Sequence, residues 1–489
     1  MLFNTFLFAL VFLPVALLGY FVISKYSQRL SIVFLFVASI AFYSYWDVRF
    51  LPLLLGSIVV NFLFGRAISS AREAGQARRA RFALIAGLVF NLGLLGFFKY
   101  ADFFGANGAA LRGLDYVPLG VTLPIGISFF TFTQIAYLVD CHVASVREYK
   151  PENYGLFVTY FPHLIAGPIL HHKDMMPQFD AAQSHVCSRG RLVVGVTFFV
   201  IGLFKKVVLA DGAARFVGPV FDVHHASLTM LEAWCGALAY TFQLYFDFSA
   251  YSDMAYGLSY LFGIVLPINF NSPYKATSII DFWRRWHITL SNFLRDYLYI
   301  PLGGNRRGAT RRHLNLLITM LLGGLWHGAN WTFVIWGGLH GCYLGINHAL
   351  RHLLGERRSR ALQITGWAIT FLAVVLAWVF FRASSVPIAL DVLRAMLTGT
   401  FASADGGAAG LDRIMAIREC VAWLCALAAI AFLAPNAYDL LGRGIQQDKE
   451  AAWGAGRGGM LLGALIAAGL LLLTISETRG VSEFLYFNF

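Results

Sequence analysis

Long apolar stretches recur along the chain and are separated by short polar or basic segments. They cover residues 2–23, 30–45, 50–64, 82–98, 192–209, 367–381, 421–433 and 460–475. A helix needs about 20 apolar residues to cross a hydrocarbon core of about 30 Å, and several of these stretches approach that length. The pattern therefore predicts an all-α polytopic membrane protein.

The composition supports this prediction. Of the 489 residues, 58% are hydrophobic and only 13% are charged, which is far too apolar for an ordinary soluble protein. The first stretch holds Pro14 at its middle and shows neither a basic leader nor a small-residue cleavage site before Lys25, so we expect a retained span rather than a signal peptide. The six cysteines lie mostly in or beside apolar segments, and we expect them to pack rather than to form disulfides or bind zinc.

Charge is distributed unevenly among the connecting segments. The 38 Lys and Arg residues exceed the 26 Asp and Glu residues by 12, and the basic residues gather at 25–29, 66–81, 306–312 and 351–360. Intervening segments such as 391–419 are near neutral. Because cytoplasmic loops carry an excess of Lys and Arg, this alternation predicts basic loops in the cytoplasm and both termini outside. It explains the net charge without nucleic acid as a partner.

One titratable side chain, His327, falls inside an apolar run at residues 323–331. The basic clusters on either side both belong in the cytoplasm, so residues 313–350 must enter the membrane and return. Residues 314–326 provide only about 20 Å of helix, which is too short to cross and leaves His327 at membrane depth. Glycines at 323, 324, 328, 337, 338 and 341 permit close helix approach. A histidine inside an apolar segment is a functional candidate. An equally open alternative at this point is that His327 only forms a hydrogen bond to a neighbouring helix.

A second polar segment precedes it at residues 281–297. As one continuous helix it has an apolar face of Trp283, Trp286, Leu290, Phe293, Leu294 and Tyr297 beside a stripe of Arg284, His287, Ser291 and Arg295. We expect an amphipathic helix at the cytoplasmic boundary, which can be a simple interfacial anchor. Alternatively, its arginines and the following Gly-Gly-Asn loop with Arg306 and Arg307 can bind the phosphates of a cytosolic donor.

Five stretches closely resemble the membrane-bound O-acyltransferase (MBOAT) superfamily, and within it the bacterial alginate O-acetyltransferase branch. They are residues 123–129, 161–168, 243–253, 282–299 and 321–341, of which the last three are highly specific. The resemblance implies a single MBOAT membrane domain over 1–489, with N-terminal spans at 1–110, a catalytic core at 120–345, and C-terminal spans and a tail at 361–489. It also implies tilted transmembrane helices with re-entrant and amphipathic helices around a central tunnel.

The resemblance implies a site as well. His327 matches the superfamily's essential intramembrane histidine, and His287 matches its second characteristic polar position. The implied donor is cytosolic acetyl-CoA, held by Trp326 together with Arg284, Arg285, Arg295, Arg306 and Arg307. A neutral His327 would take the proton of the attacking hydroxyl, and His287 would orient the donor or the base.

The C-terminal residues 484–489 are strongly aromatic. They can form part of an aromatic belt at the membrane interface. They also resemble the terminal aromatic motif of related envelope-acylation machineries, in which a tyrosine is proposed to accept the acyl group. That resemblance implies Tyr486 as a covalent relay, because a phenol ester is more activated than an alkyl ester.

Three functions remain open at this level. The leading interpretation is an O-acetyltransferase of the bacterial inner membrane that modifies an exported polysaccharide such as alginate, with a periplasmic partner of the serine-hydrolase type. The second applies the same chemistry to cellulose, peptidoglycan or teichoic acid, and the third is a transporter or lipid flippase with a histidine proton relay. We expect no metal site, because the histidine pairs at 171–172 and 224–225 lack a third ligand at useful spacing.

Overall fold

The computed structural model describes residues 1–144, 146–148, 150–222, 228–354, 359–400, 408–445 and 455–485. Within these ranges the chain forms helices and loops, and no strand occurs in them. The contacts divide the chain into two compact units. The first consists of residues 1–203, 251–268 and 441–488, and the second of residues 204–250, 269–440 and 489.

The first unit is built from long apolar helices and shorter connecting ones. In chain order they are η1 (Leu7–Phe12), α1 (Leu13–Ser24), α2 (Gln28–Ser44), η2 (Val48–Phe50), α3 (Leu51–Glu73), α4 (Ala77–Leu95), η3 (Gly96–Tyr100), α5 (Ala101–Leu111), α6 (Ile127–Val143), α7 (Pro151–Thr159), α8 (His172–Phe179), η4 (Ala182–His185), α9 (Arg189–Phe204) and α21 (Ala455–Thr478). Pro14 lies just after the π-helix η1 passes directly into α1, and it lacks the N–H that another residue would donate inside this continuous helical segment.

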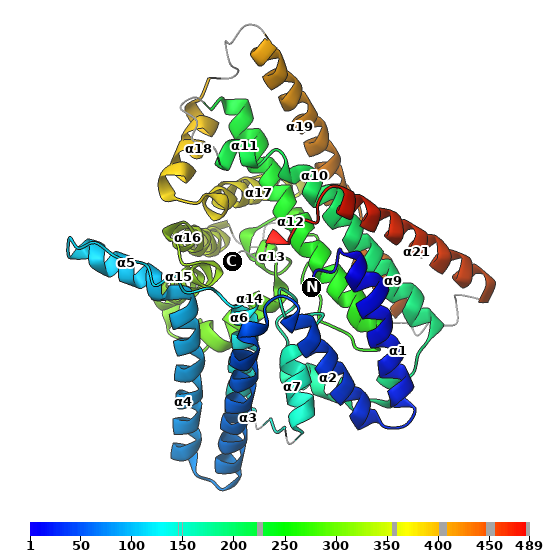
Figure 1. Cartoon of the computed structure of the whole chain (residues 1–489). Coiled ribbons are helices and arrows are strands. Elements are labelled where there is room, and N and C mark those ends of the chain that lie inside the picture. The colour runs from blue at the N-terminus through cyan, green and yellow to red at the C-terminus, as the bar shows by residue number, and fades with distance from the viewer. Residues whose placement is uncertain are drawn as a thin grey trace. The chain divides into compact units, whose positions relative to one another are not determined.

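An antiparallel pair formed by α3 and α4 illustrates how these helices are held (Figure 1). Gly75 has a φ of +68°, which ends α3 and reverses the chain. Inside the pair, the buried Asn61 Nδ2 donates to Asn91 Oδ1 at 3.2 Å. Two amides that satisfy each other in this way remove the cost of placing either one among apolar side chains.

The second unit contains the helices that carry the candidate site. They are η5 (Lys205–Ala210), α10 (Asp211–Ala214), α11 (Gly218–Phe221), η6 (Pro273–Lys275), α13 (Ile279–Trp283), α14 (Ile288–Leu294), η7 (Arg295–Tyr299), α15 (Gly308–His327), α16 (Trp331–Leu354), α17 (Arg360–Arg382), α18 (Val386–Thr398), α19 (Ala408–Leu433) and the start of α20 (Ala437–Ile445). The long helix α12 (Met230–Leu261) begins in this unit and ends in the first.

Seven helical segments of the described chain are long and apolar enough to cross a membrane. They are Leu7–Ser24, Val48–Glu73, Ala77–Leu111, Arg189–Ala214, Arg360–Arg382, Asp412–Leu433 and Gly459–Thr478. The predicted stretch at 30–45 corresponds to α2, which has 17 residues. Each apolar stretch read from the sequence therefore lies wholly or largely in helices, and the chain is a multi-pass membrane protein. Neither α15 nor α16 is among the seven segments.

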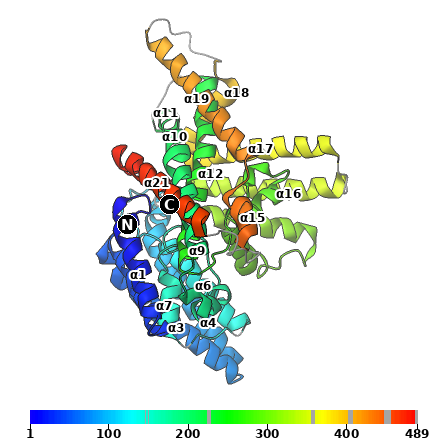
Figure 2. The same cartoon turned by 90° about the vertical axis from the view of Figure 1, so that its right-hand side faces the viewer.

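Helices α15 and α16 pack together closely along their length (Figures 1 and 2). A Cβ on Gly324 would lie 2.2 Å from the carbonyl oxygen of Phe333, and one on Gly337 would lie 2.2 Å from that of Met320. Only glycine permits backbones to approach so closely. The prediction that glycines bring two helices together near His327 is confirmed.

The single amphipathic helix predicted over residues 281–297 is wrong. Helix α13 ends at Trp283, and α14 begins only at Ile288. Between them, His287 has φ 41° and ψ 55°, the left-handed region that a non-glycine residue seldom adopts. The expected polar stripe is broken at this point, so His287 is fully buried instead of lying among the interfacial arginines.

Candidate active site

His327 is the last residue of α15 and lies in an aromatic cluster of the second unit. Gly328 adopts an extended conformation that ends the helix. The His327 side chain is buried, and its ring centroid is 5.0 Å from that of Trp326 and 5.1 Å from those of Trp336 and Phe381. The last two rings meet it edge to face. Apolar rings that exclude water surround this imidazole.

The turn after His327 is fixed by Asn330. Its side-chain oxygen accepts from the Thr332 backbone N–H at 3.0 Å, and its Nδ2 donates to the Ser384 carbonyl at 2.8 Å. The first bond supports the start of α16, and the second joins the turn to the segment between α17 and α18. The position of His327 is therefore set from both sides of the α15–α16 connection.

His287 is hydrogen-bonded to Asn269, which lies 18 positions upstream. The Asn269 side-chain oxygen is 3.1 Å from His287 Nδ1, and it accepts from the backbone N–H and the hydroxyl of Thr289 at 3.3 and 2.9 Å. The Asn269 carbonyl also accepts from the Ile288 N–H at 2.9 Å. These bonds hold the unusual backbone of His287 in place, as expected where strain serves a site.

The same bonds assign the His287 tautomer. A backbone N–H can only donate, so the Asn269 atom facing Thr289 is its oxygen, and His287 Nδ1 must carry the proton that it donates there. The lone pair is then on Nε2. Burial lowers the pKa of His287 to about 3, so the ring is neutral near pH 7.

Trp326 joins the two predicted histidines into one site. Its ring centroid lies 6.4 Å from that of His287 and 5.0 Å from that of its neighbour His327. On its other side, His287 meets the edge of Phe248 from α12 at 4.7 Å. The structure thus brings His287, in its strained turn, together with Trp326 and His327 at the end of α15.

The predicted donor-binding arginines fall into two groups. Arg285 pairs with Asp281 and Arg295 pairs with Asp296, at 2.9 and 2.7 Å. The other three, Arg284, Arg306 and Arg307, are exposed and form no ion pair with a carboxylate of the described chain. Intramolecular pairing leaves the first two less available to a phosphate than the other three.

The loop that carries Arg306 and Arg307 has a defined backbone. Gly303 and Gly304 have φ values of 113° and 53°, which only glycine adopts readily. The buried Asn315 of α15 donates to the Gly304 carbonyl at 3.0 Å. The loop is therefore attached to the helix that ends in His327.

Several residues of this region could not be identified from the sequence. Asn269 lies outside every motif that the sequence analysis identified, and its only signal is that it is a polar residue in a partly apolar segment. Trp336 and His340 are in α16, where an aromatic and histidine mixture is also typical of a packed core. Tyr486, the predicted relay, lies outside the described residues.

Other polar groups of the second unit are structural. Buried Lys206 pairs with Asp247 and Asp211, both at 2.9 Å. A buried charge is tolerated when it is paired in this way. Asp247 of α12 is thus held by Lys206 of η5.

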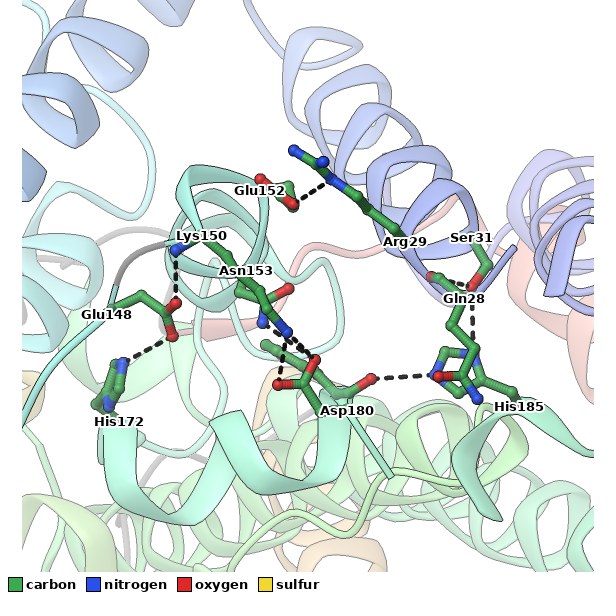
Figure 3. A network of polar contacts seen from close by, with 11 residues as sticks. Gln28, Arg29, Ser31, Glu148, Lys150, Glu152, Asn153, His172, Asp180 and His185 are labelled. Atoms are coloured by element: carbon green, nitrogen blue, oxygen red, sulfur yellow. Dashed lines mark hydrogen bonds and ion pairs between the residues drawn. The ribbon is translucent and has the colours of Figure 1, made fainter. Parts of the chain in front are cut away.

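The first unit has its own polar network, shown in Figure 3. It borders a cavity of about 330 Å³. Arg29 pairs with Glu152 at 2.6 Å, and Lys150 pairs with Asp180 at 2.8 Å. Both cations already have carboxylate partners, so the cavity lacks the surplus positive charge that a phosphate-bearing donor requires.

Two buried histidines of the first unit contact structural groups. His172 contacts Glu148 at 3.3 Å, and His163 contacts the Phe157 carbonyl at 2.9 Å. Across the described residues, no group of three or more His, Cys, Asp or Glu side chains is arranged to hold a metal ion. The second unit therefore contains the stronger candidate site.

The chain is similar to proteins of one known family. The pattern of the MBOAT, membrane-bound O-acyltransferase family, matches residues 6–387. Over 424 residues the chain is 46% identical to the peptidoglycan O-acetyltransferase of Helicobacter pylori, covering 81% of this chain and 80% of that protein. It is 43% identical over 404 residues to the "Probable alginate O-acetylase AlgI" of Pseudomonas aeruginosa, covering 81% and 75%.

A more distant relative is the teichoic acid D-alanyltransferase of Streptococcus thermophilus, 27% identical over 286 residues and covering 53% of this chain and 68% of that protein. All three relatives are named for the transfer of an acyl group to a cell-envelope polymer or exported polysaccharide. A transporter or flippase finds no counterpart among them. With a family match over most of its length and two relatives above 40% identity, the chain belongs to the membrane-bound O-acyltransferase family and is an acyltransferase.

Proposed function

We propose that the protein is an O-acetyltransferase of the bacterial inner membrane, which takes acetyl from cytosolic acetyl-CoA and passes it outward to an exported polysaccharide such as alginate. The observation that carries the proposal is the pair of buried histidines joined by Trp326. Buried imidazoles in a water-excluding aromatic cluster suit acyl transfer, in which water would hydrolyse the donor. The names of the relatives support the reaction class.

In this proposal His327 is the general base. A hydroxyl oxygen attacks the thioester carbonyl while the imidazole takes its proton. The C–S bond then breaks, and the CoA thiolate leaves and recovers the proton. General-base assistance is typically worth about 10² to 10⁴-fold, and orientation of donor and acceptor within the site supplies a large further share.

His287 acts through its Nε2 lone pair. Its Nδ1 proton is committed to Asn269, so the ring can accept a hydrogen bond but offers no second N–H. It can therefore orient the attacking hydroxyl or the N–H of the donor's pantetheine arm. It is less suited to hold the thioester carbonyl, which needs a donor.

The donor's phosphates are proposed to meet Arg306 and Arg307. Replacing both with alanine should raise the KM for acetyl-CoA about five- to fiftyfold and leave kcat nearly unchanged, because one or two charge-assisted hydrogen bonds are lost in the bound state. Steady-state CoA release by purified protein measures this. Arg78 and Arg79, an adjacent exposed pair in α4, provide the matched control. An unchanged KM, or an equal change in the Arg78→Ala/Arg79→Ala variant, contradicts the assignment.

Tyr486 is proposed as a covalent relay near the periplasmic face. The Tyr486→Phe variant should retain acetyl-CoA binding but lose nearly all acetylation of the polymer, because it lacks the phenol oxygen that forms the ester. Polymer-bound acetate and the mass of the C-terminal peptide are the measurements. Normal acetylation by Tyr486→Phe would mean that the aromatic tail is only an interfacial anchor.

The acceptor can be distinguished by analysis of intact cells. Deleting the gene and restoring it should remove and restore O-acetyl groups on one envelope polymer. Acetyl esters are measured separately on exported uronate polysaccharide, cellulose, peptidoglycan and teichoic acid, which identifies the polymer that is modified. Loss from an exported polysaccharide supports the proposal, whereas loss from peptidoglycan alone supports the alternative suggested by the Helicobacter pylori relative.

Topology and partners complete the proposal. With basic loops in the cytoplasm, both termini are periplasmic and the C-terminal tail can meet a periplasmic acetyltransferase of the serine-hydrolase type. Such a partner would unload the acetyl group onto the polysaccharide. Cysteines introduced near residues 2 and 483 should then react with a membrane-impermeant thiol reagent added to intact spheroplasts.

A further inference from the structure

His340 is a third histidine of the second unit, and the family resemblance assigned it no role. It lies in α16, is completely buried, and has its ring 4.9 Å from that of Trp336. The Trp336 ring in turn meets His327 edge to face at 5.1 Å. One tryptophan thus separates the proposed base from a second buried imidazole.

The tautomer of His340 is opposite to that of His287. Trp283 Nε1 lies 3.3 Å from His340 Nδ1. An indole N–H can only donate, so Nδ1 is the acceptor and the proton of the neutral ring is on Nε2. The lone pair of neutral His287 is on Nε2, whereas His340 carries its proton on Nε2.

That N–H has no acceptor among the described residues, although His340 Nε2 is buried. The indole Nε1 of Trp336 is in the same situation. A buried donor without an acceptor loses the hydrogen bond that it makes with water in the unfolded chain, and native structures contain few such donors. Two such donors on one helix, four residues apart and beside the proposed base, indicate an acceptor that arrives with the substrate.

We propose that His340 Nε2–H and Trp336 Nε1–H form the donor pair that binds the carbonyl oxygen of the acetyl thioester. This inference rests on the proposed acetyltransferase function. As the hydroxyl oxygen bonds to the carbonyl carbon, the C=O π electrons move onto its oxygen, and His327 takes the hydroxyl proton. The two N–H groups stabilise that oxyanion without giving up their protons. The C=O bond re-forms as the C–S bond breaks and CoA leaves.

The purely structural alternative is that His340 only anchors Trp283. Two variants separate the roles. His340→Asn keeps an oxygen near Nδ1 that can accept from Trp283 but removes the donor at the Nε2 position. His340→Gln reaches the Nε2 position with an amide N–H but gives up the Nδ1 acceptor. If His340 has only a structural role, His340→Asn should be the more active variant. If His340 stabilises the oxyanion, His340→Gln should be the more active one.

The test is acetyl-CoA-dependent CoA release by full-length protein in proteoliposomes, with kcat and KM determined separately. We expect kcat to fall about 10² to 10³-fold in His340→Asn with little change in KM, as is typical for one lost oxyanion donor. His340→Gln should recover at least tenfold of that loss, and Trp336→Phe should also lower kcat. Comparable thermal unfolding of the variants controls for misfolding.

The outcomes are separable. If the wild type releases CoA and His340→Asn has a wild-type kcat, or if Asn is more active than Gln, the donor role of His340 is overturned while the proposed function stands. If the wild type releases no CoA with any acceptor, the proposed function itself fails and the donor pair with it. Binding of S-ethyl-CoA, a thioether without the carbonyl, should be equal in wild type and His340→Asn, and a large loss there would assign His340 to structure.

Discussion

Replacing His327 with alanine is expected to abolish acetyl ester on the polymer while leaving an inserted, correctly folded protein. The imidazole lies at the end of α15 with rings of Trp326, Trp336 and Phe381 around it. Water cannot readily replace a base in such surroundings, so the loss should be at least 10² to 10⁴-fold. Polymer-bound acetate in a deletion strain carrying the variant is the measurement.

His348 is the matched control for this change. It is also a histidine of the second unit, but it lies near the far end of α16 and is only partly buried. His348→Ala should retain polymer acetylation within a few-fold of wild type. Normal polymer acetylation by His327→Ala would show that this histidine has no part in the mechanism. An equal loss of acetylation in His327→Ala and His348→Ala would indicate a general defect in folding or insertion.

Replacing Gly324 with alanine is expected to destabilise the protein severely, even though alanine is the better helix former by about 1 kcal/mol. The new Cβ would lie 2.2 Å from the Phe333 carbonyl oxygen and 3.1 Å from Gly337 Cα. Neither is a side chain that can rotate away, so α15 and α16 must separate. A loss of several kcal/mol is expected, as for other overpacked close contacts, seen as low yield of monodisperse protein and a much reduced melting temperature.

Gly338, the residue after Gly337 in α16, is the matched control for the close approach of the two helices. A Cβ there would meet only the Leu321 side chain at 3.5 Å, an ordinary contact. Gly338→Ala should therefore be neutral or slightly stabilising. If Gly324→Ala has the same melting temperature as Gly338→Ala and the wild type, the fold does not require the close packing of the two helices.

The helices of this protein could be predicted from the sequence because the bilayer demands long apolar runs that stand out locally. The reversal of the chain after His327 could also be predicted, because the basic clusters on either side required residues 313–350 to enter the membrane and return. Gly324 and Gly337 were recognisable for a similar reason, because small residues near a reversal permit close packing.

The environment of His287 could not be predicted in this way. Residues 281–297 have the periodicity of one amphipathic helix, and nothing local predicts a break. The break is stabilised by Asn269, 18 residues away, whose oxygens accept from the backbone on the far side of the turn. The hydrogen bonds from this distant residue outweigh the local preference of residues 281–297 for one continuous helix.

The donors of α16 were hidden for a different reason. A histidine among tryptophans is as typical of a core as of a site, and only the hydrogen-bond geometry separates the two. The bond from Trp283 fixes which nitrogen of His340 carries the proton. Sequence can name the residue, but the direction in which its N–H points depends on the packing of α13 against α16.

The central claim is that the paired histidines form a site for acetyl transfer from acetyl-CoA. The most direct measurement uses purified wild-type protein and His327→Ala with acetyl-CoA labelled in the acetyl group, following both CoA release and label on the protein or added polysaccharide. The account predicts that the wild type releases CoA with stoichiometric transfer of label, and that His327→Ala binds acetyl-CoA but transfers none. Equal transfer by the two proteins, or CoA binding without transfer by the wild type in the presence of acceptor and partner, would contradict it.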